Sequence, residues 1–391
     1  MALDIVQIRK ETPGCHDKTF LNSAGASLMP KPVIDIMHEY LEYETMVGGY
    51  QAVPKYQTAV QKFYEATAQL IGCHTNNIAY CYNATDAFGK AVTSIPFQQG
   101  DIILTTDDDY ISNHFLFISL QNRFGINIVR GVNSPNGDLD LKDFESKMKE
   151  LKPALVSVTH IPTNTGKVQP VAEIGQLCSK YNIIYIVDAC QSVGQIDVNV
   201  HEIKCDFLSA TGRKFLRGPR GTGFLYVSDK MLHLNYHPLL LDMRGAIWTE
   251  DNEYKLEQNA TRYELWESNY GNLIGLGQAI DYAQNIGLAN IHAYNNSLCS
   301  HLKHGLNGCK DLIITENGSK SAGIITFTSK TMSQEIIEAK LKEALISYSV
   351  GYRHFALIDF NKKDVDWVVR LSPHYFNTIS EMEYVADVLC R

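Results

Sequence analysis

Residues 209–223 read Ser209-Ala-Thr-Gly-Arg213-Lys214-Phe-Leu-Arg217-Gly218-Pro-Arg-Gly221-Thr-Gly223, which places a lysine just after a predicted strand and before a glycine-rich turn. A lysine in this position is usually solvated, so Lys214 alone does not indicate catalysis. Asp188 is the second residue of interest, because it ends the apolar run 183–187. An acid placed there is costly to bury unless it meets a cation or hydrogen-bond donors, although Asp188 alone could simply cap the next helix.

Outward from these residues, short apolar runs alternate with amphipathic stretches between about residues 75 and 230. This alternation predicts βαβ units and an α/β fold with a mostly parallel sheet. We expect strands at 77–82, 101–106, 126–129, 154–160, 183–188, 206–210 and 223–227, and helices at 86–94, 141–151 and 171–181. Polar residues stand at or just past the carboxyl ends of several strands: Asn83, Thr106, His160, Asp188 and Thr211. Because ligands of open α/β sheets bind at these ends, we expect a shared site there.

The flanking sequence predicts helices before the sheet and a smaller second domain after it. Residues 31–45 and 55–71 have helical patterns, and 269–305 is typical of one long helical crossover. The tail predicts a strand at 323–328, a helix at 333–346, a strand at 365–372 and a helix at 380–389. We therefore expect an N-terminal segment at 1–20 that packs on the small domain, a large domain at 21–265, and a crossover helix with a small α+β domain at 266–391.

Composition excludes several classes of protein. Of the 391 residues, 45% are hydrophobic and 20% charged, as in ordinary globular proteins rather than disordered chains. The net charge of -8 provides no basic field, so we expect no nucleic-acid partner. The longest uncharged run, 66–85, is broken by polar residues, so we expect no membrane segment. The nine cysteines are scattered without a CxxC pair, which favours a cytoplasmic location and no metal site.

A third feature joins Lys214 and Asp188. Asn83-Ala84-Thr85 stands between a predicted strand and a helix start, where free backbone N–H groups and a hydroxyl can bind an anion, although the same residues suit an ordinary N-cap. An anion cradle, a buried acid and a lysine at three strand ends together match the needs of pyridoxal 5′-phosphate. Its phosphate needs the cradle, its ring nitrogen a carboxylate, and its aldehyde an amine.

Ordered motifs over nearly the whole length carry a family resemblance. They are Leu21-Asn22-Ser23-Ala24-Gly25, Asp188-Ala-Cys-Gln191-Ser and Arg370-Leu-Ser-Pro-His-Tyr-Phe-Asn377-Thr378. With these motifs the chain resembles the class V aminotransferase family of fold-type I pyridoxal phosphate enzymes. That family includes cysteine desulfurases, isopenicillin N epimerases and hercynylcysteine sulfoxide lyases. The resemblance implies a seven-stranded, mostly parallel sheet flanked by helices, a smaller C-terminal domain, a homodimer and a small amino-acid substrate.

The resemblance also implies residue roles. Lys214 would be catalytic and form the Schiff base, Asp188 would pair with the pyridine nitrogen, and Gln191, helped by Thr163, would bond the phenolic oxygen. Tyr110 falls where relatives place a ring stacked on the cofactor. The phosphate would be held by Ala84, Thr85, Thr211 and Arg213. Arg370 would bind the substrate α-carboxylate with Asn22 nearby, and the structural alternative for Arg370 is an ion pair with Glu381 or Glu383.

The choice of reaction depends on a loop. The resemblance implies that a desulfurase carries a nucleophilic cysteine ahead of the carboxylate-binding arginine. Here the comparable stretch is Tyr352-Arg353-His354-Phe355-Ala356, and the sequence has no cysteine between Cys309 and Cys390. We therefore expect a C–S lyase of the epimerase and sulfoxide-lyase branch, which converts a cysteine S-conjugate or sulfoxide to pyruvate, ammonia and a sulfur product by β-elimination. Amino-acid epimerase or racemase, aminotransferase and cysteine desulfurase are the enzyme alternatives, and a non-catalytic pyridoxal phosphate-binding protein is the remaining one.

Overall fold

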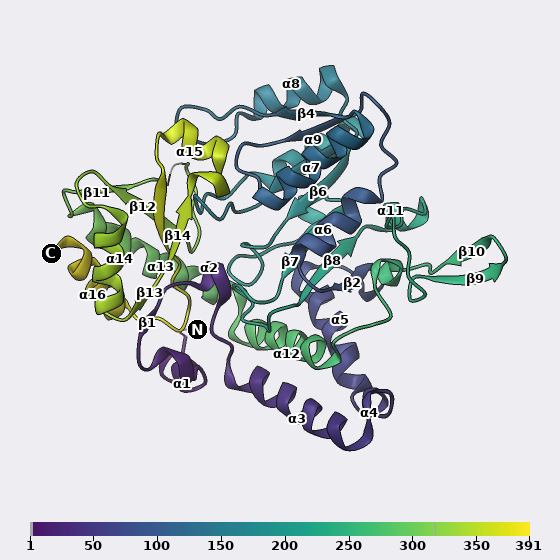
Figure 1. Cartoon of the computed structure of the whole chain (residues 1–391), viewed down its shortest axis with the longest axis horizontal. Helices are drawn as coiled ribbons and strands as arrows, with labels where there is room; N and C mark the ends of the chain where they lie inside the picture. Colours follow the sequence, from purple (N-terminus) through teal and green to yellow (C-terminus); the bar gives the residue numbers. More distant parts are fainter. Residues whose placement is uncertain (1–2, 317) are drawn as a thin grey trace.

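A seven-stranded sheet forms the centre of the protein (Figure 1), for which a computed structural model describes residues 3–316 and 318–391. Residues 1 and 2 of the expected N-terminal segment lie outside these ranges. The strand order is β2-β8-β7-β6-β5-β3-β4, and β8 alone runs antiparallel to its neighbours in this sheet. The bounds are β2 Ile78–Cys81, β3 Ile102–Thr105, β4 Asn127–Arg130, β5 Leu155–Thr159, β6 Ile184–Asp188, β7 Phe207–Thr211 and β8 Gly223–Val227. The expected fold class and all seven expected strands are confirmed.

Helices cover both faces of this sheet because apolar side chains project from its strands in both directions. One face packs against α5 Gln57–Ile71, α8 Leu141–Leu151, α9 Val171–Tyr181 and α12 Tyr270–Ile286. The other packs against α6 Ala84–Thr93, α7 Ile111–Phe124 and α11 Asp229–His233. Short α10 Val200–Ile203 precedes β7. The run Asp107-Asp108-Asp109 favours a helix start before α7, but apolar periodicity gave no bounds for this helix, because its Phe115, Ile118 and Phe124 are exposed and blur the helical period.

The long helix expected at 269–305 is two helices. Helix α12 ends at Ile286 and α13 runs over Leu288–Asn307, because Gly287 takes a φ of 92° that a continuing helix cannot accept. Before the sheet, α3 Lys31–Val47 and α4 Gly49–Lys55 lead into α5. A hairpin of β9 Ala246–Glu250 and β10 Glu253–Leu256 projects from the large sheet at the right of Figure 1. The side chains of this hairpin are mostly exposed, so the sequence has no alternation of apolar and polar residues from which the hairpin could be predicted.

The C-terminal part forms a four-stranded antiparallel sheet in the order β11-β12-β15-β14. Its elements are β11 Leu312–Ile314, β12 Ile325–Ser329, α14 Gln334–Glu343, β13 Ile346–Ser347, β14 Ser349–Tyr352, α15 Leu357–Lys363, β15 Trp367–Leu371 and α16 Ile379–Cys390. The N-terminal α1 Ile5–Lys10, β1 Thr19–Phe20 and α2 Ser23–Ala26 lie beside it, and β1 pairs with β13. The domain limits at residues 20 and 265 stay a prediction.

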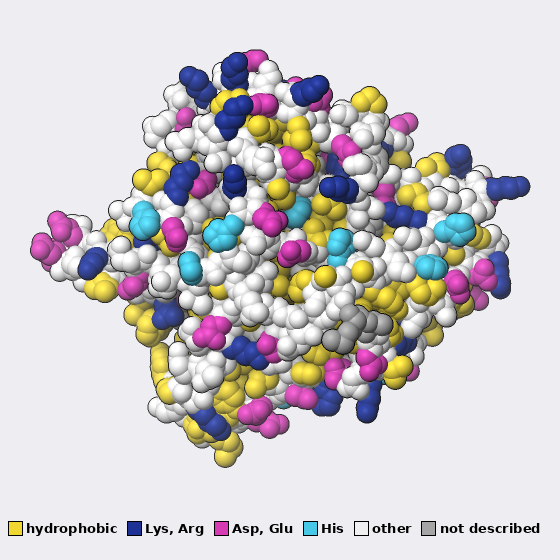
Figure 2. Space-filling model, turned by 180° about the vertical axis from the view of Figure 1, so that it is seen from behind, with side chains coloured by type: hydrophobic (Ala, Val, Ile, Leu, Met, Phe, Trp, Pro, Cys, Tyr) yellow, Lys and Arg dark blue, Asp and Glu magenta, His cyan; other side chains and the backbone are white. Residues whose placement is uncertain are grey.

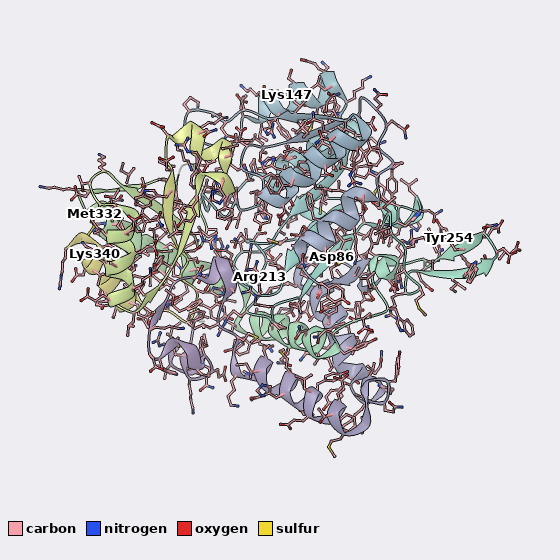
Figure 3. All side chains as sticks on the ribbon, viewed as in Figure 1. Asp86, Lys147, Arg213, Tyr254, Met332 and Lys340 are labelled. Atoms are coloured by element: carbon pink, nitrogen blue, oxygen red, sulfur yellow. A yellow bond between two sulfur atoms is a disulfide. The ribbon has the colours of Figure 1, made fainter. Side chains whose placement is uncertain are left out.

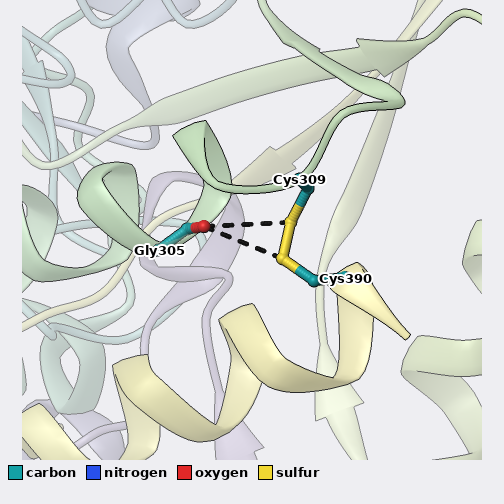
Figure 4. The surroundings of a disulfide bond; sticks show 3 residues. All are labelled: Gly305, Cys309 and Cys390. Atoms are coloured by element: carbon teal, nitrogen blue, oxygen red, sulfur yellow. Dashed lines mark hydrogen bonds between the residues drawn. A yellow bond between two sulfur atoms is a disulfide. The ribbon is translucent and has the colours of Figure 1, made fainter.

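Two further features concern the outside of the molecule. Cys309, just after α13, is disulfide-bonded to Cys390 at the end of α16, which closes a loop with a sequence separation of 81 (Figure 4). This pairing was not expected from scattered cysteines. On the face in Figure 2, acidic and basic side chains are interspersed. None of the helices described is both long and apolar enough to cross a membrane.

Candidate active site

The carboxyl ends of β5, β6 and β7 meet at a cavity of about 290 Å³. This cavity gathers residues that the sequence separates by as many as 139 positions, from Tyr82 to Gly221, because parallel strands bring their ends to one edge of the sheet. Every residue expected to contact the cofactor lines it: Ala84, Thr85, Tyr110, Thr163, Asp188, Gln191, Thr211, Arg213 and Lys214. The roles of the individual side chains within the cavity stay predictions.

Lys214 and Asp188 are buried rather than solvated. Burial lowers the pKa of Lys214, and the thiol of Cys190 and the carboxylate of Asp188 oppose that shift. Burial raises the pKa of Asp188, while the backbone N–H of Cys190 donates to its Oδ1 at 3.0 Å and opposes the rise. The ammonium of Lys214 lies 5.9 Å from the ring centroid of Tyr110. Asp188 is therefore a buried acid that gains from a cationic partner, and Lys214 an amine that loses its proton more readily than usual.

The N-terminus of α6 forms one wall of this cavity. Asn83 is its N-cap, and the Asn83 Oδ1 accepts from the backbone N–H of Asp86 at 2.9 Å. The first N–H groups of a helix have no partner inside the helix, so those of Ala84 and Thr85 remain available to a bound anion. The structure confirms that Asn83 caps the helix, and Ala84 and Thr85 line the cavity, while their binding of an anion stays a prediction. Arg220 and Arg213 add positive charge to the cavity lining.

Gln191 is held by its neighbours. Its Nε2 donates to Thr163 Oγ1 at 2.9 Å and to the carbonyl oxygen of Ala24 at 3.1 Å, which uses both amide hydrogens. Its Oε1 is buried without a hydrogen-bond partner among the described residues. In this orientation of the amide, a bond from Gln191 to a phenolic oxygen requires Nε2 to exchange one of these two acceptors.

Arg370 lies at a second cavity, of about 420 Å³, which shares Tyr110, Thr163, Arg213 and Lys214 with the first. Its guanidinium donates to Thr163 Oγ1 and, at 3.3 Å, to Asn22 Oδ1, while its buried Nε has no partner in the described chain. Burial and the charge of Arg213 lower the pKa of Arg370 to about 10, so it stays cationic near neutral pH.

The ion-pair alternative for Arg370 is wrong. Glu381 instead accepts from Arg9 at 3.0 Å, and no carboxylate of residues 3–316 and 318–391 forms a salt bridge with Arg370. Figure 3 labels Arg213 between the large sheet and the C-terminal part, which is where the two cavities join. Arg370 is thus a cation directed at a cavity rather than at a structural acid.

Sequence reasoning assigned no role to Asn113. Its Nδ2 donates to Asp188 Oδ2 at 3.2 Å and to Asp109 Oδ1 at 2.9 Å, so it positions the carboxylate of Asp188. Asp109 also accepts from Thr159 Oγ1, at 2.5 Å, and from the backbone N–H of Tyr110. The signal was present in the run Asp109-Tyr110-Ile-Ser-Asn113, whose one-turn spacing matters only once residues 111–124 are known to be helical.

The run Asp107-Asp108-Asp109 does not make a metal site. Asp107 accepts from Lys362 and Asp108 forms a buried ion pair with Lys167 at 2.7 Å, so the three carboxylates face different partners. No group of three His, Cys, Asp or Glu side chains in the described part of the chain is arranged to hold a metal ion.

The residues present suit pyridoxal 5′-phosphate. Free N–H groups at the start of α6, with Arg213 and Arg220, suit a phosphate, and the buried carboxyl of Asp188 on the same cavity suits a protonated ring nitrogen, because a cation offsets the cost of burying its charge. Lys214 supplies a buried amine for the aldehyde. These groups line one cavity at the carboxyl edge of the sheet.

Comparisons with known proteins agree on the family. A family model described as "Aminotransferase class-V" matches residues 19–385. A probable cysteine desulfurase of Pyrococcus abyssi is 31% identical, over 98% of this chain and 96% of that protein. A probable cysteine desulfurase of Methanothermobacter thermautotrophicus is 28% identical, over 98% of this chain and 96% of that protein.

Solved structures give the same picture. The apo structure of cysteine desulfurase from Thermococcus onnurineus NA1 superimposes with a TM-score of 0.91 at 27% identity, covering 100% of this chain and 98% of that one. The cystine C-S lyase C-DES, solved with its reaction product cysteine persulfide, has a TM-score of 0.86 at 23% identity, with 97% and 99% coverage, and shows the fold alone. These relatives support the wider desulfurase group and do not support the specific epimerase and sulfoxide-lyase branch expected from the sequence.

Proposed function

The chain belongs to the class V aminotransferase family, whose cofactor is pyridoxal 5′-phosphate, and from that premise we propose that it cleaves the C–S bond of L-cysteine or of an S-substituted L-cysteine. The curated and solved relatives named above are cysteine desulfurases and a cystine C-S lyase, and both names describe the breaking of a bond to sulfur. An amino-acid substrate agrees with the unpaired cation Arg370 beside Lys214.

Each charged residue of the site has a task in this proposal. When bound, pyridoxal 5′-phosphate stabilises the electron pair that remains at the substrate Cα after proton removal. Arg370 binds the α-carboxylate through its planar fork, and Asn22 and Thr163 orient that fork. Lys214 accepts the Cα proton, a task helped by its lowered pKa because more of the amine is neutral near pH 7. Asn113 keeps the carboxylate of Asp188 in place.

One observation favours β-elimination over sulfur transfer to the enzyme: Phe355, and no thiol, stands on the wall of the Arg370 cavity. The cysteines nearest in sequence, Cys309 and Cys390, are joined in the disulfide. Cys190 is the only cysteine in the described chain that lines either cavity, and burial raises the pKa of its thiol, which disfavours the reactive thiolate.

Elimination balances with the groups at hand. Lys214 removes the Cα proton, and the Cβ–S bond breaks with its electron pair on sulfur, which then takes up a proton. The three-carbon remainder takes up water and yields pyruvate and ammonia. The sulfur leaves together with its substituent, so no enzyme thiol is needed.

Cysteine desulfurase is the second candidate, and the comparisons favour it, since the relatives cited above carry that name. This reaction requires a thiol to accept the sulfur and releases alanine. Among the described cysteines, Cys190 is the one placed to be tested for that role.

Product analysis separates the candidates. Cofactor-saturated protein is incubated with L-cysteine and, separately, S-methyl-L-cysteine, and pyruvate, ammonia and alanine are measured together. Equal pyruvate and ammonia, unchanged in Cys190→Ala and lost in Lys214→Ala, support elimination. Alanine that disappears in Cys190→Ala supports the desulfurase, and inversion at Cα without C–S cleavage refutes both.

A homodimer and a cytoplasmic location, both expected from the sequence, stay predictions. Sedimentation equilibrium of the purified protein tests the first. Fractionation of the source cells tests the second.

A further inference from the structure

We infer that the cavity beside Arg370 holds an uncharged, apolar sulfur substituent of about the size of a benzyl group. The inference rests on the proposed C–S cleavage and names the substrate class of that same site. It concerns the walls of this cavity that lie beyond Arg370 and the residues shared with the first cavity.

The position of the cavity ties it to the reacting atoms. Tyr110, Thr163, Arg213 and Lys214 line both this cavity and the one that suits the cofactor, so the two spaces adjoin. Arg370 lies on the second cavity alone. A substrate whose carboxylate reaches Arg370 and whose Cα faces Lys214 therefore has its side chain next to the remaining walls of the second cavity.

Those remaining walls are largely apolar and aromatic. One side comes from α7, and the other from β14, the one-turn helix Arg353–Phe355, α15 and β15. The apolar side chains on these walls include Phe115, Val350, Tyr352, Phe355, Phe360 and Val368. Aromatic walls favour an aromatic substituent, because offset or edge-to-face contacts between rings add binding free energy beyond that of the apolar area that they bury.

Phe355 on the cavity wall belongs to a cluster of rings with Tyr352 and His354. The rings of His354 and Phe355 lie 4.1 Å apart between centroids, and Tyr352 lies 6.3 Å from Phe355. Despite its apolar character Phe355 is 51% exposed, and Phe115 on the opposite element is 63% exposed. A substituent between these rings removes apolar surface from water, which favours binding.

The volume of the cavity and the charges that line it further restrict the substituent that it can hold. The cavity of about 420 Å³ lies in the range of pockets that hold whole small molecules, whereas L-cysteine brings only a thiol past its Cβ. No aspartate or glutamate of the described chain lines this cavity, and its cations are Arg213, Lys214 and Arg370. A cationic substituent is therefore repelled. An apolar one gains from the rings without competing for the guanidinium of Arg370.

Binding tests the inference independently of turnover. O-methyl-L-serine and O-benzyl-L-serine copy the S-substituted cysteines with an oxygen that leaves poorly, and their dissociation constants follow from the absorbance of the bound cofactor. We expect the benzyl compound to bind at least about tenfold more tightly, because each buried methylene alone contributes roughly fourfold. In pyruvate assays, S-benzyl-L-cysteine should have a KM lower than that of S-methyl-L-cysteine by a similar factor.

A matched pair of variants assigns the effect to this wall. Phe355→Ser should reduce the benzyl preference several-fold, because it should weaken the binding of O-benzyl-L-serine much more than that of O-methyl-L-serine. Phe124→Ser removes an equally exposed ring of α7 outside this cavity, and it should change neither constant. An equal loss of affinity for both ligands in Phe355→Ser would show a general structural effect and contradict the inference.

The outcomes also separate the inference from the proposed function. Preference for the benzyl compound without pyruvate from any S-substituted cysteine would refute the proposed reaction and uphold the cavity assignment. Pyruvate formation with no benzyl preference would uphold the proposed reaction and refute the cavity assignment. Tighter binding of S-carboxymethyl-L-cysteine than of S-propyl-L-cysteine would assign the cavity to an anionic group near Arg213 and overturn the inference.

Discussion

Arg370 offers the sharpest test of the proposed site, through the substitution Arg370→Lys. The lysine keeps the positive charge and loses the planar fork that reaches two carboxylate oxygens at once. It also leaves Asn22 Oδ1 and Thr163 Oγ1 without their guanidinium partner. The residues expected to hold the cofactor line the other cavity, so the absorbance of the bound cofactor should not change.

The magnitude follows from one lost charge-assisted hydrogen bond. Such a bond contributes about 1.5–3 kcal/mol. Because each 1.4 kcal/mol is a factor of ten, kcat/KM should fall roughly 10- to 150-fold, mainly through KM.

The assay compares each substrate with its α-carboxamide, which has no carboxylate for Arg370 to bind. The wild-type protein should strongly prefer the acid, and Arg370→Lys should lose most of that preference. Arg9→Lys is the matched control, because Arg9 is also partly buried but pairs with Glu381 away from the cavities. Equal losses for acid and amide in Arg370→Lys would refute the anchoring role and return Arg370 to a structural one.

Three further predictions concern the lysine, its acid and a buried ion pair. Lys214→Ala should abolish turnover, and borohydride should then fix no cofactor to the chain by mass spectrometry; cofactor fixed to another lysine would contradict the assignment. Asp188→Asn should keep the cofactor but lower kcat by about two decades or more, since the buried negative charge is gone, and near wild-type turnover in saturated protein would exclude this role. Lys167→Met leaves Asp108 unpaired and almost wholly buried, so the free energy of unfolding measured with urea should fall by about 3–5 kcal/mol. Lys31→Met, which breaks an exposed pair, should cost under about 1 kcal/mol, and equal losses would refute the burial argument.

Most of the large sheet could be predicted from the sequence because all of its strands except the edge strand β4 are largely buried. Runs such as 183–188 carry apolar residues at nearly every position, and several of them end in a polar residue at the edge where we expect ligands to bind. Elements with weak or exposed apolar patterns escaped this reasoning. Helix α7 and the β9–β10 hairpin expose many of their apolar residues, so their sequences carry no clear period.

Long-range pairings could not be predicted for a different reason. Asn113 reaches Asp188 across 75 positions, and Cys309 reaches Cys390 across 81. Neither pairing leaves a local pattern, because the contact is created by the packing of α7 against the sheet edge and of α16 against α13. Nine scattered cysteines allow many pairings, and the sequence favours none of them.

The charges that line the two cavities favour anionic ligands. The chain as a whole carries a net charge of -8, yet the two adjoining cavities are lined by Lys214, Arg213, Arg220 and Arg370 against the single carboxylate of Asp188. Burial lowers the pKa of Lys214, and the charges of Arg213 and Arg370 lower it further, which shows that these cations repel one another. A phosphate at the start of α6 would relieve the repulsion between these cations in the first cavity, and a carboxylate at Arg370 would relieve it in the second. Binding of the cofactor should therefore stabilise the folded chain, because a ligand that binds only the folded state adds to its stability.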